Sequence, residues 1–273
     1  MKRIIVTAAN EGFRELLLGL LNSLRQWDDD LCDAIGILDL GLSEESKKQV
    51  ERQVDIVITP RWDLPIEPEI RAKKPYLRGM TARPFLREYF PGYDQYLWMD
   101  ADTWVQDKRA ITIFFDAAGR EGAAAAFQDH PAYRHTKNNT AWRLNNLIGY
   151  YGEFGKRAYD AERYYNTGVL AIGADSELWR LWQYWFMAGV KRNGSYASDQ
   201  TALNFTIYTE KYPVTSLDAI YNWCCHLGGV LLNRSTGDFH EPIDPFRRLG
   251  IIHLTADAKD NSALRFPSKG RHG

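Results

Sequence analysis

Short β-branched runs alternate with longer amphipathic stretches along most of the chain. The run Arg3 to Thr7 is followed by a loop and then by leucines at helical spacing up to Leu24, which predicts a strand, a loop and a helix. The next elements are predicted in the same way, as a strand over Ala34 to Leu40, a helix from a capping Ser43 to about Val54 and a strand over Ile56 to Thr59. Because strands alternate with helices, we expect right-handed crossovers and a mainly parallel sheet, whose ligand crevice lies at the carboxyl ends of the strands.

The middle of the chain is predicted to hold a loop, a helix and two strands. Asp63 to Pro75 is rich in proline and charge and is interpreted as an irregular loop. Thr81 to Phe90 is predicted as a helix with Pro84 in its first turn, leading into a buried strand over Tyr96 to Met99. The alanine-rich run Gly122 to Gln128 suits either strand or helix. We predict a strand, because a glycine precedes the run and Asp-His-Pro ends it.

The second half begins with a polar and aromatic segment over 133 to 165, which we interpret as a lid or an insertion beside a ligand site. A strand over Asn166 to Gly173 and a helix from about Ser176 to Val190 follow. Aromatic residues at helical spacing in that helix predict a stripe that faces the core: Trp179, Trp182, Trp185 and Phe186. Ser198 begins a further capped helix, and Gly250 to Leu254 is predicted as a last short strand.

The composition is that of a soluble globular protein. The 273 residues are 45% hydrophobic and 25% charged, and no linker is visible, so we expect one α/β domain over 1–273. The formal net charge of -1 gives no bulk electrostatic reason for binding nucleic acid. The basic tail from Arg265 to His272 is either a solvated surface or a weak peripheral contact with a membrane.

The expected location is the reducing cytoplasm. The amino terminus lacks the apolar region of a signal peptide, and no stretch reaches the roughly 18 apolar residues of a membrane span. Cys32, Cys224 and Cys225 match neither a disulfide framework nor a zinc-ligand spacing.

Two carboxylates stand one residue apart at the end of the buried strand, Asp100 and Asp102. In an extended chain positions i and i+2 face the same way, so the pair could hold one hard divalent cation at the edge of the sheet. A solvated turn that closes the strand is the alternative, because so short a motif needs structural context.

Further motifs follow that pair in order: Asp129, Asn166-Thr-Gly-Val, Asp199-Gln200-x-x-Leu203-Asn204, and His253 with Lys259 six residues later. Together they resemble the GT-A type nucleotide-sugar glycosyltransferases, most closely the retaining family 8 group that includes bacterial galactosyl- and glucosyltransferases and glycogenin. The resemblance covers nearly the whole chain. It implies a single GT-A, Rossmann-like domain with a nucleotide-binding part over about 1–107 and a sugar and acceptor part over about 108–273.

The resemblance also implies a metal site. Asp100, Asp102 and His253 would bind Mn²⁺ or Mg²⁺, and oxygen ligands with one imidazole suit Mn²⁺. A metal across both phosphates of a nucleoside diphosphate stabilises the charge that develops when the sugar leaves, and Lys259 would add positive charge there. Without the other motifs, His253 would more simply be a packed histidine.

The remaining site residues are likewise implied by the resemblance. Thr7, Ala8 and Asn10 fall where the family binds the base and ribose, and Ala101 and Arg83 fall in the donor site. Asp129, Asn166 and Asp199 match residues that hold sugar hydroxyls, and Gln200 matches the residue nearest the reacting carbon, which makes Gln200 and Asp199 the candidate catalytic residues. No strong nucleophile is present, so attack by the acceptor on the same face is expected. The simpler alternatives are helix capping for Asp129 and Asp199 and an exposed helix charge for Arg83.

The function implied is a metal-dependent retaining transfer of a hexose from a UDP-sugar to a glycan or lipid-linked saccharide acceptor. The family pattern His-x-x-Gly-x-x-Lys-Pro-Trp is only partly kept, because Ala256 replaces the glycine and the Pro-Trp is absent. A catalytically silent nucleotide-sugar or carbohydrate-binding protein of the same fold is therefore the alternative.

Two rival enzyme classes fit less well. A haloacid dehalogenase type phosphatase would need its paired aspartates near the amino terminus and Thr or Val where Trp104 stands. A nucleotidyltransferase would need a glycine-rich basic loop after the first strand, and a dinucleotide fold would need Gly-x-Gly-x-x-Gly there, whereas this chain has Ala8-Ala-Asn-Glu-Gly12. The segment Leu217 to Trp223 also resembles a family segment, with an expected structural role.

Overall fold

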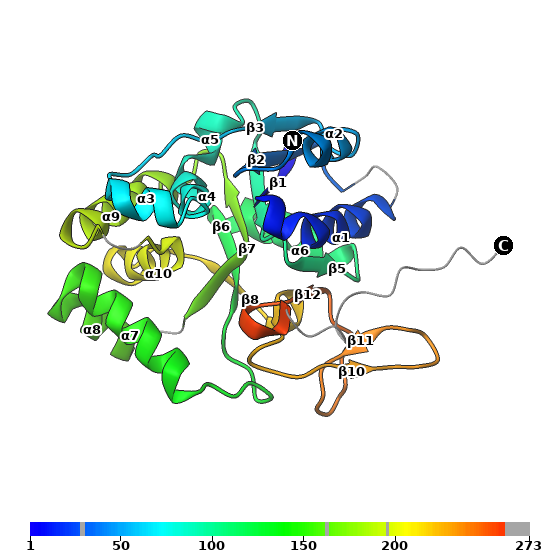
Figure 1. Ribbon diagram of the computed structural model, residues 1–273. Helices are drawn as coiled ribbons and strands as arrows, with labels where there is room; N and C mark the ends of the chain where they lie inside the picture. Colours follow the sequence, from blue (N-terminus) through cyan, green and yellow to red (C-terminus); the bar gives the residue numbers. More distant parts are fainter. Residues whose placement is uncertain (28–30, 162–163, 195–196, 260–273) are drawn as a thin grey trace.

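The computed structural model describes residues 1–27, 31–161, 164–194 and 197–259, and a seven-stranded sheet lies at its centre (Figure 1). The sheet order is β3-β2-β1-β4-β7-β6-β8. The bounds in that order are Ile56–Ile58, Ala34–Asp39, Arg3–Ala9, Gln95–Met99, Tyr165–Gly173, Ala123–Phe127 and Thr215–Leu217. All neighbouring strands are parallel except β7, which is antiparallel to both β4 and β6. The predicted α/β class with a mainly parallel central sheet is confirmed.

The reversal of β7 decides what meets at the carboxyl edge of the sheet. Gln95 of β4 pairs with Gly173, and Met99 pairs with Val169. The amino end of β7 therefore lies beside the carboxyl end of β4, where ligands bind in open α/β sheets. Residues 165–168 and the Asp100 turn are neighbours for this reason.

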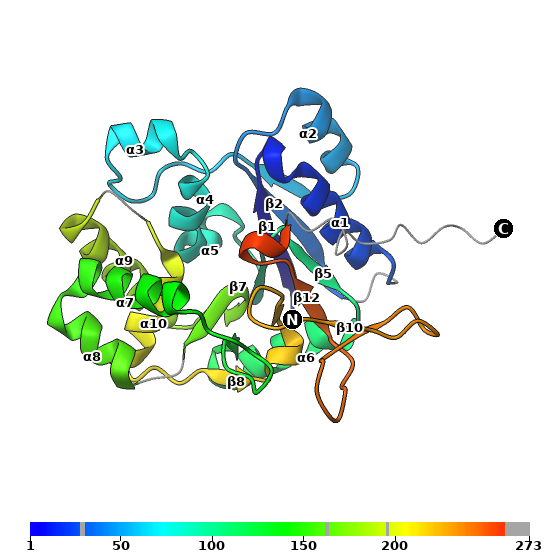
Figure 2. The ribbon, with the colours of Figure 1, turned by 60° about the horizontal axis from the view of Figure 1, so that its bottom comes forward.

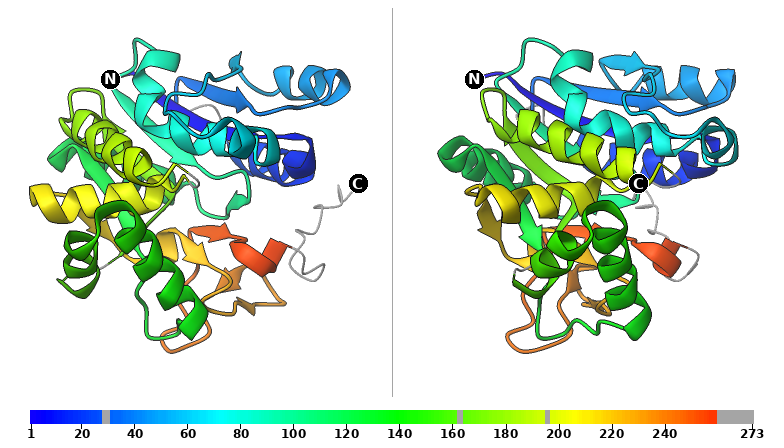
Figure 3. Two further views of the ribbon diagram at one scale, coloured as in Figure 1. Left: turned by 60° about the vertical axis from the view of Figure 1, so that its left-hand side comes forward. Right: turned by 90° about the vertical axis from the view of Figure 1, so that its left-hand side faces the viewer.

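Helices cover both faces of the sheet, as the views in Figure 3 show. Alternating side chains of β1 divide the core: Ile4 and Val6 pack on one face and Ile5 on the other. The first face is covered by α4 (Leu77–Ala82), α5 (Leu86–Tyr89), α9 (Leu178–Arg192) and α10 (Asp199–Glu210). The second face is covered by α1 (Arg14–Arg25), α2 (Glu44–Glu51) and α6 (Arg109–Glu121).

A helical pair is inserted between β6 and β7. It consists of α7 (Lys137–Tyr151) and α8 (Glu153–Ala161), and it occupies most of the segment interpreted as a lid or insertion. Tyr150 of α7 packs beside Phe186 of α9, with their ring centroids 6.4 Å apart. The pair therefore adds to the helical layer on the first face of the sheet.

A smaller sheet extends the carboxyl side of the central sheet. It contains β5 (Thr103–Val105), β12 (Ile251–His253) and β9 (Trp223–Cys224), in the order β5-β12-β9. A two-stranded hairpin of β10 (Leu231–Leu232) and β11 (Phe239–His240) projects away from the helical layers (Figure 2). Short helical segments complete the described chain: η1 (Glu11–Phe13), α3 (Pro68–Lys73), η2 (Arg83–Phe85), η3 (Ala219–Tyr221) and η4 (Ala256–Lys259).

Two local predictions were wrong. The presumed loop over 63–75 contains α3, in which Pro68 occupies the first turn, Glu69 follows it and basic residues occupy the last turn, an arrangement that suits the helix dipole. The predicted helix over 81–90 is three segments, because helical structure begins already at Leu77 and Pro84 interrupts it with the 3-10 turn η2. Proline lacks the N–H of the helical ladder and clashes with the preceding turn.

Other local predictions are confirmed. The Ala-rich run is strand β6, and Trp179, Trp182 and Phe186 of α9 are buried in the core. Trp185 is partly buried against the same cluster. Among the described residues, no helix is both long and apolar enough to span a bilayer. The basic tail lies outside the described residues, and the division near residue 107 stays a prediction.

Candidate active site

The paired carboxylates lie in a tight turn between β4 and β5. The N–H of Thr103 donates to the backbone oxygen of Asp100 at 3.0 Å. The backbone of this turn is held at both ends, because Asp100 N–H donates to Gly168 O at 2.7 Å and Leu254 N–H donates to Asp102 O at 2.9 Å. The expectation that strand alternation would align the two side chains was wrong. A turn anchored to β7 and to the end of β12 brings them together.

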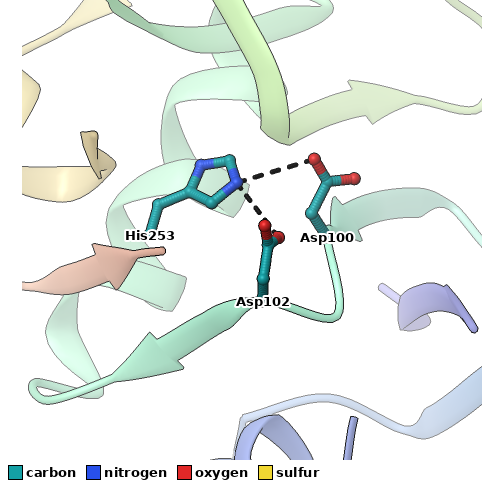
Figure 4. A group of neighbouring side chains, drawn as sticks. All are labelled: Asp100, Asp102 and His253. Atoms are coloured by element: carbon teal, nitrogen blue, oxygen red, sulfur yellow. Dashed lines mark ion pairs between the residues drawn. The ribbon is translucent and has the colours of Figure 1, made fainter. Parts of the chain in front are cut away.

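His253 completes a group of three side chains whose ligand atoms all lie within 4.8 Å of one another. Its Nε2 is 3.2 Å from Oδ1 of Asp102 and 3.7 Å from Oδ2 of Asp100 (Figure 4). His253 and Asp102 are buried, while Asp100 is partly exposed. The antiparallel pairing of His253 with Thr103 sets this contact, because it places the end of β12 directly beside the turn.

The neighbouring charges shift the pKa values of the buried Asp102 and His253 strongly and in opposite directions. Burial acts to raise the pKa of Asp102, but the adjacent His253 and Lys259 outweigh it and hold this pKa far below its usual range. Burial acts to lower the pKa of His253, but the charge of Asp102 and its hydrogen bond raise the pKa to about 10. Asp102 is therefore held as a carboxylate, the form in which it can bind a cation.

The three side chains fit a divalent metal ion. Ligand distances of 2.0–2.1 Å in an octahedral site put adjacent ligand atoms about 3 Å apart. The separations of 3.2 and 3.7 Å between Nε2 and the two carboxylates are close to that spacing. Two oxygens and one imidazole nitrogen form a donor set that Mn²⁺ accepts. The group thus has the ligand types and the spacing that such an ion requires.

Arg83 links the group of Asp100, Asp102 and His253 to the first residue of α10. Its guanidinium contacts Asp100 and donates to Oδ2 of Asp199 at 2.7 Å. The same guanidinium stacks over Trp98 at 4.3 Å from the ring centroid. Arg83 is only 8% exposed, so the alternative of an exposed helix charge is wrong.

Asp199 is held in the site by Arg83 and does not cap its helix. The hydroxyl of Ser198 accepts from Thr201 N–H and is the cap of α10. Burial raises the pKa of Asp199, although Arg83 opposes this. The capping alternative for Asp199 is therefore wrong.

Gln200 and Asn166 meet at the amino end of β7. Asn166 Nδ2 donates to Gln200 Oε1 at 3.0 Å, and the N–H of Thr167 donates to the same oxygen at 3.1 Å. A Cβ built at Gly168 would lie 2.1 Å from Cε1 of His253 and 2.8 Å from Oδ1 of Asn166. The glycine at 168 therefore lets the imidazole lie against β7 beside Asn166.

The first strand ends at the same edge and carries two buried oxygen atoms that lack a hydrogen-bond partner. These are Oγ1 of Thr7 and Oδ1 of Asn10. Ala8 lies between them at the end of β1, and Ala101 is buried within the carboxylate turn. Buried polar atoms are normally paired, so the two oxygens are candidates for contact with a ligand.

Asp129 lies in a different place. It lines a cavity of about 320 Å³ together with His130, Asp218 and Arg247, and neither Asp100, Asp102 nor His253 lines that cavity. The expected role of Asp129 at the sugar stays a prediction.

The loop after His253 keeps a glycine-like backbone despite its alanine. Ala256 has φ of +48°, in the left-handed region. Lys259 nevertheless reaches the site, since its Nζ is 2.8 Å from Oδ2 of Asp102 and 4.9 Å from the centroid of the Phe13 ring. The substitution changes the strain of the loop and leaves its approach to Asp102 intact.

Asn222 is a site residue that the sequence interpretation missed. Its Oδ1 is 2.9 Å from Nδ1 of His253, and its Nδ2 donates to Oδ1 of Asn166 at 2.8 Å. The segment around Asn222 resembles a family segment, but its contact with His253 depends on the parallel pairing of β9 and β12. A two-residue strand such as β9 gives no periodic signal in the sequence.

The mainly parallel sheet with the Asp-turn-Asp group at its carboxyl edge has the GT-A fold, and the family model that matches the chain makes it a glycosyltransferase. The sequence model of glycosyl transferase family 8 matches residues 4–259, and the chain belongs to that family.

Solved structures support the fold. The galactosyltransferase LgtC, in complex with donor and acceptor sugar analogues, has 18% identity and a TM-score of 0.58, with 93% of this chain and 87% of that chain covered. An active-site mutant of LgtC gives a TM-score of 0.57 at 18% identity over the same shares. The bifunctional glycosyltransferase WbbM in its apo form has 15% identity and a TM-score of 0.56, with 93% of this chain and 46% of that chain covered. No curated protein sequence matches significantly.

Proposed function

We propose that this glycosyltransferase is metal-dependent and transfers a hexose from a UDP-sugar with retention of configuration. The observation that carries the proposal is the group Asp100, Asp102 and His253 with Lys259 bound to Asp102. In this proposal the three side chains hold Mn²⁺ or Mg²⁺. When bound, such an ion neutralises the charge that develops on a departing diphosphate.

Different residues around that group are proposed to contact different parts of the donor. Thr7, Ala8 and Asn10 are proposed to meet the nucleoside, because Thr7 and Asn10 carry unpaired buried oxygens at the carboxyl end of β1. Lys259 is proposed to place its ammonium group at the diphosphate. Its distance of 2.8 Å from Asp102 supports this position.

Arg83, Asp199, Asn166 and Gln200 are proposed to face the transferred sugar. The ion pairs of Arg83 with Asp100 and Asp199 connect the proposed metal ligands to the proposed sugar side. Ala101 is assigned to the donor by its position in the turn, and Asp129 by the family motif alone. An amide such as Gln200 is a weak nucleophile, so attack by the acceptor hydroxyl on the same face as the leaving group fits these residues better than a covalent intermediate.

The acceptor is proposed to be a glycan or a lipid-linked saccharide, and the reaction is proposed to take place in the cytoplasm. The LgtC structure was solved with donor and acceptor sugar analogues, which supports a sugar acceptor for this chain. The insertion that contains α7 and α8 is the candidate acceptor side, because loops and insertions at such an edge vary between proteins that share a fold.

The proposal is tested with UDP-glucose, UDP-galactose and their N-acetyl and uronic forms. Each is added with Mn²⁺, and both the melting temperature and slow UDP release are measured. A true donor stabilises the native state by mass action and is hydrolysed slowly in the absence of acceptor. Removal of divalent ions with a chelator should abolish both effects.

The matched variants are Asp102→Asn in the site and Asp107→Asn outside it. Asp107 pairs with Arg109 and Arg248 and has no contact with His253. Loss of UDP release in the first variant alone supports the metal assignment, whereas full activity of Asp102→Asn would refute it.

The second candidate function is a silent sugar-nucleotide binding protein. The strained backbone of Ala256 favours it, because the family pattern has glycine at this position. Binding of a UDP-sugar without any UDP release, in wild type and in Ala256→Gly alike, would establish this alternative.

A further inference from the structure

A chain of buried hydrogen bonds runs from the proposed metal ligand His253 to Gln200. Nδ1 of His253 lies 2.9 Å from Oδ1 of Asn222, and Nδ2 of Asn222 donates to Oδ1 of Asn166 at 2.8 Å. Nδ2 of Asn166 then donates to Oε1 of Gln200 at 3.0 Å. Asn222 is 1% exposed, so water does not compete for its bonds to His253 and Asn166.

Two backbone N–H groups fix the direction of every bond in this chain. Gly168 N–H lies 2.8 Å from Oδ1 of Asn166, and Thr167 N–H lies 3.1 Å from Oε1 of Gln200. A backbone N–H can only donate, so the atom that faces it in each side-chain amide must be the oxygen. The O and N positions of both amides therefore follow from the network.

The orientation of Asn222 follows from that of Asn166. Because Oδ1 of Asn166 accepts, the atom of Asn222 that faces it must be the NH₂ group, and the oxygen of Asn222 must face His253. That oxygen accepts a hydrogen bond from Nδ1–H of the imidazole. Nε2 is then the nitrogen left for a metal, and it is the atom that faces Asp100 and Asp102.

The hydrogen bonds of Gln200, at the other end of this series of bonds, have equally well defined directions. Oε1 of Gln200 is occupied by Asn166 and by the backbone of Thr167. Among the described residues, no hydrogen bond of good geometry leaves the amide nitrogen of Gln200, although this side chain lies close enough to the Tyr164 hydroxyl to act against the rise in its pKa that burial causes. Gln200 therefore offers N–H donors, and its carbonyl oxygen is not available to a substrate.

We propose that Asn222 is a positioning residue that sets both ends of this site at once. It fixes the imidazole of His253 with Nε2 toward the metal position, and through Asn166 it holds Gln200 as a hydrogen-bond donor to an oxygen of the transferred sugar. The inference rests on the proposed function for the identity of the two ligands. The donor and acceptor roles of the side chains in these hydrogen bonds do not depend on that function.

The test uses two variants of Asn222 and one control. Asn222→Ala removes both bonds, whereas Asn222→Asp keeps an acceptor for His253 but has no N–H for Asn166. The control is Gln95→Ala, because Gln95, at the start of β4, is also a buried amide, bonded to the backbone oxygen of Phe115 and to Arg3 and not to His253. It should lower stability without affecting the hydrogen bonds between His253 and Gln200.

The first readout is the affinity for Mn²⁺ alone, measured by electron paramagnetic resonance. Outer-shell partners of a ligating histidine are typically worth 10–100-fold in metal affinity. We expect Asn222→Ala to weaken Mn²⁺ binding by about that factor, and Asn222→Asp and Gln95→Ala to change it by less than about threefold. Equal weakening in Gln95→Ala and Asn222→Ala would overturn the proposal, because a general loss of stability would then explain both.

The second readout is the ring N–H of His253 in ¹⁵N-histidine-labelled protein, recorded by NMR without metal and with the diamagnetic ion Cd²⁺. We expect a solvent-protected Nδ1–H in wild type that survives Cd²⁺ binding at Nε2, persists in Asn222→Asp and is lost in Asn222→Ala. Cd²⁺ binding at Nδ1, or a protected signal that survives in folded Asn222→Ala, would overturn the proposal.

These results separate the inference from the proposed function. If the protected Nδ1–H depends on Asn222 but wild-type protein hydrolyses no UDP-sugar, the positioning role stands and the enzyme assignment fails. If Mn²⁺-dependent hydrolysis occurs and neither readout responds to Asn222→Ala, the enzyme assignment stands and the positioning role fails. At the Gln200 end, Asn222→Asp should lower turnover at least tenfold while Mn²⁺ affinity is kept, and an unchanged turnover would overturn that half of the proposal.

Discussion

A Cβ at Gly168 would lie 2.1 Å from Cε1 of the His253 imidazole, so β7 and β12 can meet only because residue 168 has no side chain. Gly168→Ala should therefore displace His253 from Asp102 and weaken Mn²⁺ binding by at least tenfold. Calorimetric titration with Mn²⁺ measures this directly.

Gly173→Ala is the matched control for that variant. Gly173 is at the far end of the same strand, and its nearest atom to an added Cβ is 3.8 Å away. Unchanged Mn²⁺ affinity in both variants would mean that His253 is not a ligand.

Arg83 should be needed for both stability and donor binding. Removing one partner of a buried ion pair leaves a buried charge and typically costs about 3–5 kcal/mol. Arg83→Gln should lower the free energy of unfolding by roughly that amount in urea titrations. Arg83→Lys should recover part of the stability but not donor affinity, because an ammonium group cannot replace the planar guanidinium that contacts Asp100 and Asp199 together.

The exposed Arg87 provides the comparison, four residues further along the chain. Its replacement by glutamine should change stability by less than about 1 kcal/mol, as is usual for surface substitutions. Equal losses in Arg87→Gln and Arg83→Gln would contradict the role given to the buried ion pairs.

Ala256→Gly should relieve the loop that carries Lys259. A left-handed backbone costs an L-residue roughly 1–2 kcal/mol, and glycine adopts it without that penalty. We expect unchanged or slightly higher thermal stability and tighter donor binding, measured by the shift in melting temperature with a UDP-sugar. Gly237 also has a positive φ, of 74°, and Gly237→Ala tests the opposite change on an exposed turn away from the site. A weaker response to donor in Ala256→Gly would show that the alanine contributes to the site.

We expect the buried carboxylate of Glu241 to make the free energy of unfolding decrease as the pH falls into the acidic range. This carboxylate is fully buried, with Nε of Arg247 at 2.7 Å and Nε2 of His130 at 3.0 Å. Burial acts to raise the pKa of Glu241, but its bonds to Arg247 outweigh this and lower the pKa below its ordinary value of 4.5. A carboxyl group with a lowered native pKa stabilises the fold above the unfolded value and loses that contribution as the pH falls through the native value.

Urea titrations of wild type and Glu241→Gln at pH 7 and pH 4 measure this effect. The wild type should be more stable than the variant at pH 7, and the difference should shrink toward pH 4 and below. The exposed Glu177→Gln should show no such change with pH. A constant difference between wild type and Glu241→Gln across this range would contradict the assignment.

Local patterns predicted the strands and helices that hold the site, because each strand run and helix stripe is a continuous segment of the chain. The apolar runs of β1, β4 and β7 and the cap at Ser198 are of this kind. The reversed direction of β7 was not predictable in the same way. It depends on how strands far apart in the sequence pair.

The site was predicted from motifs more completely than from physical chemistry. Asp100, Asp102 and His253 were identified together through a family resemblance, and the structure brings them within ligand distance. The physical argument first given for the two aspartates was wrong, since a turn positions them. Asn222 escaped notice because its importance comes from its two partners, His253 and Asn166, which lie 31 and 56 residues away in the sequence.

The helical pair α7 and α8 lies between two strands that are hydrogen-bonded neighbours. Because Ala123 of β6 pairs with Ile172 of β7, the chain leaves the sheet and returns beside the strand it left. A graft that keeps the buried residues Leu147, Tyr150, Tyr151 and Ala158 should therefore exchange the proposed acceptor side, while the strands that carry the proposed donor residues keep their register. Chimeras with other members of the family can use these two strands as junctions.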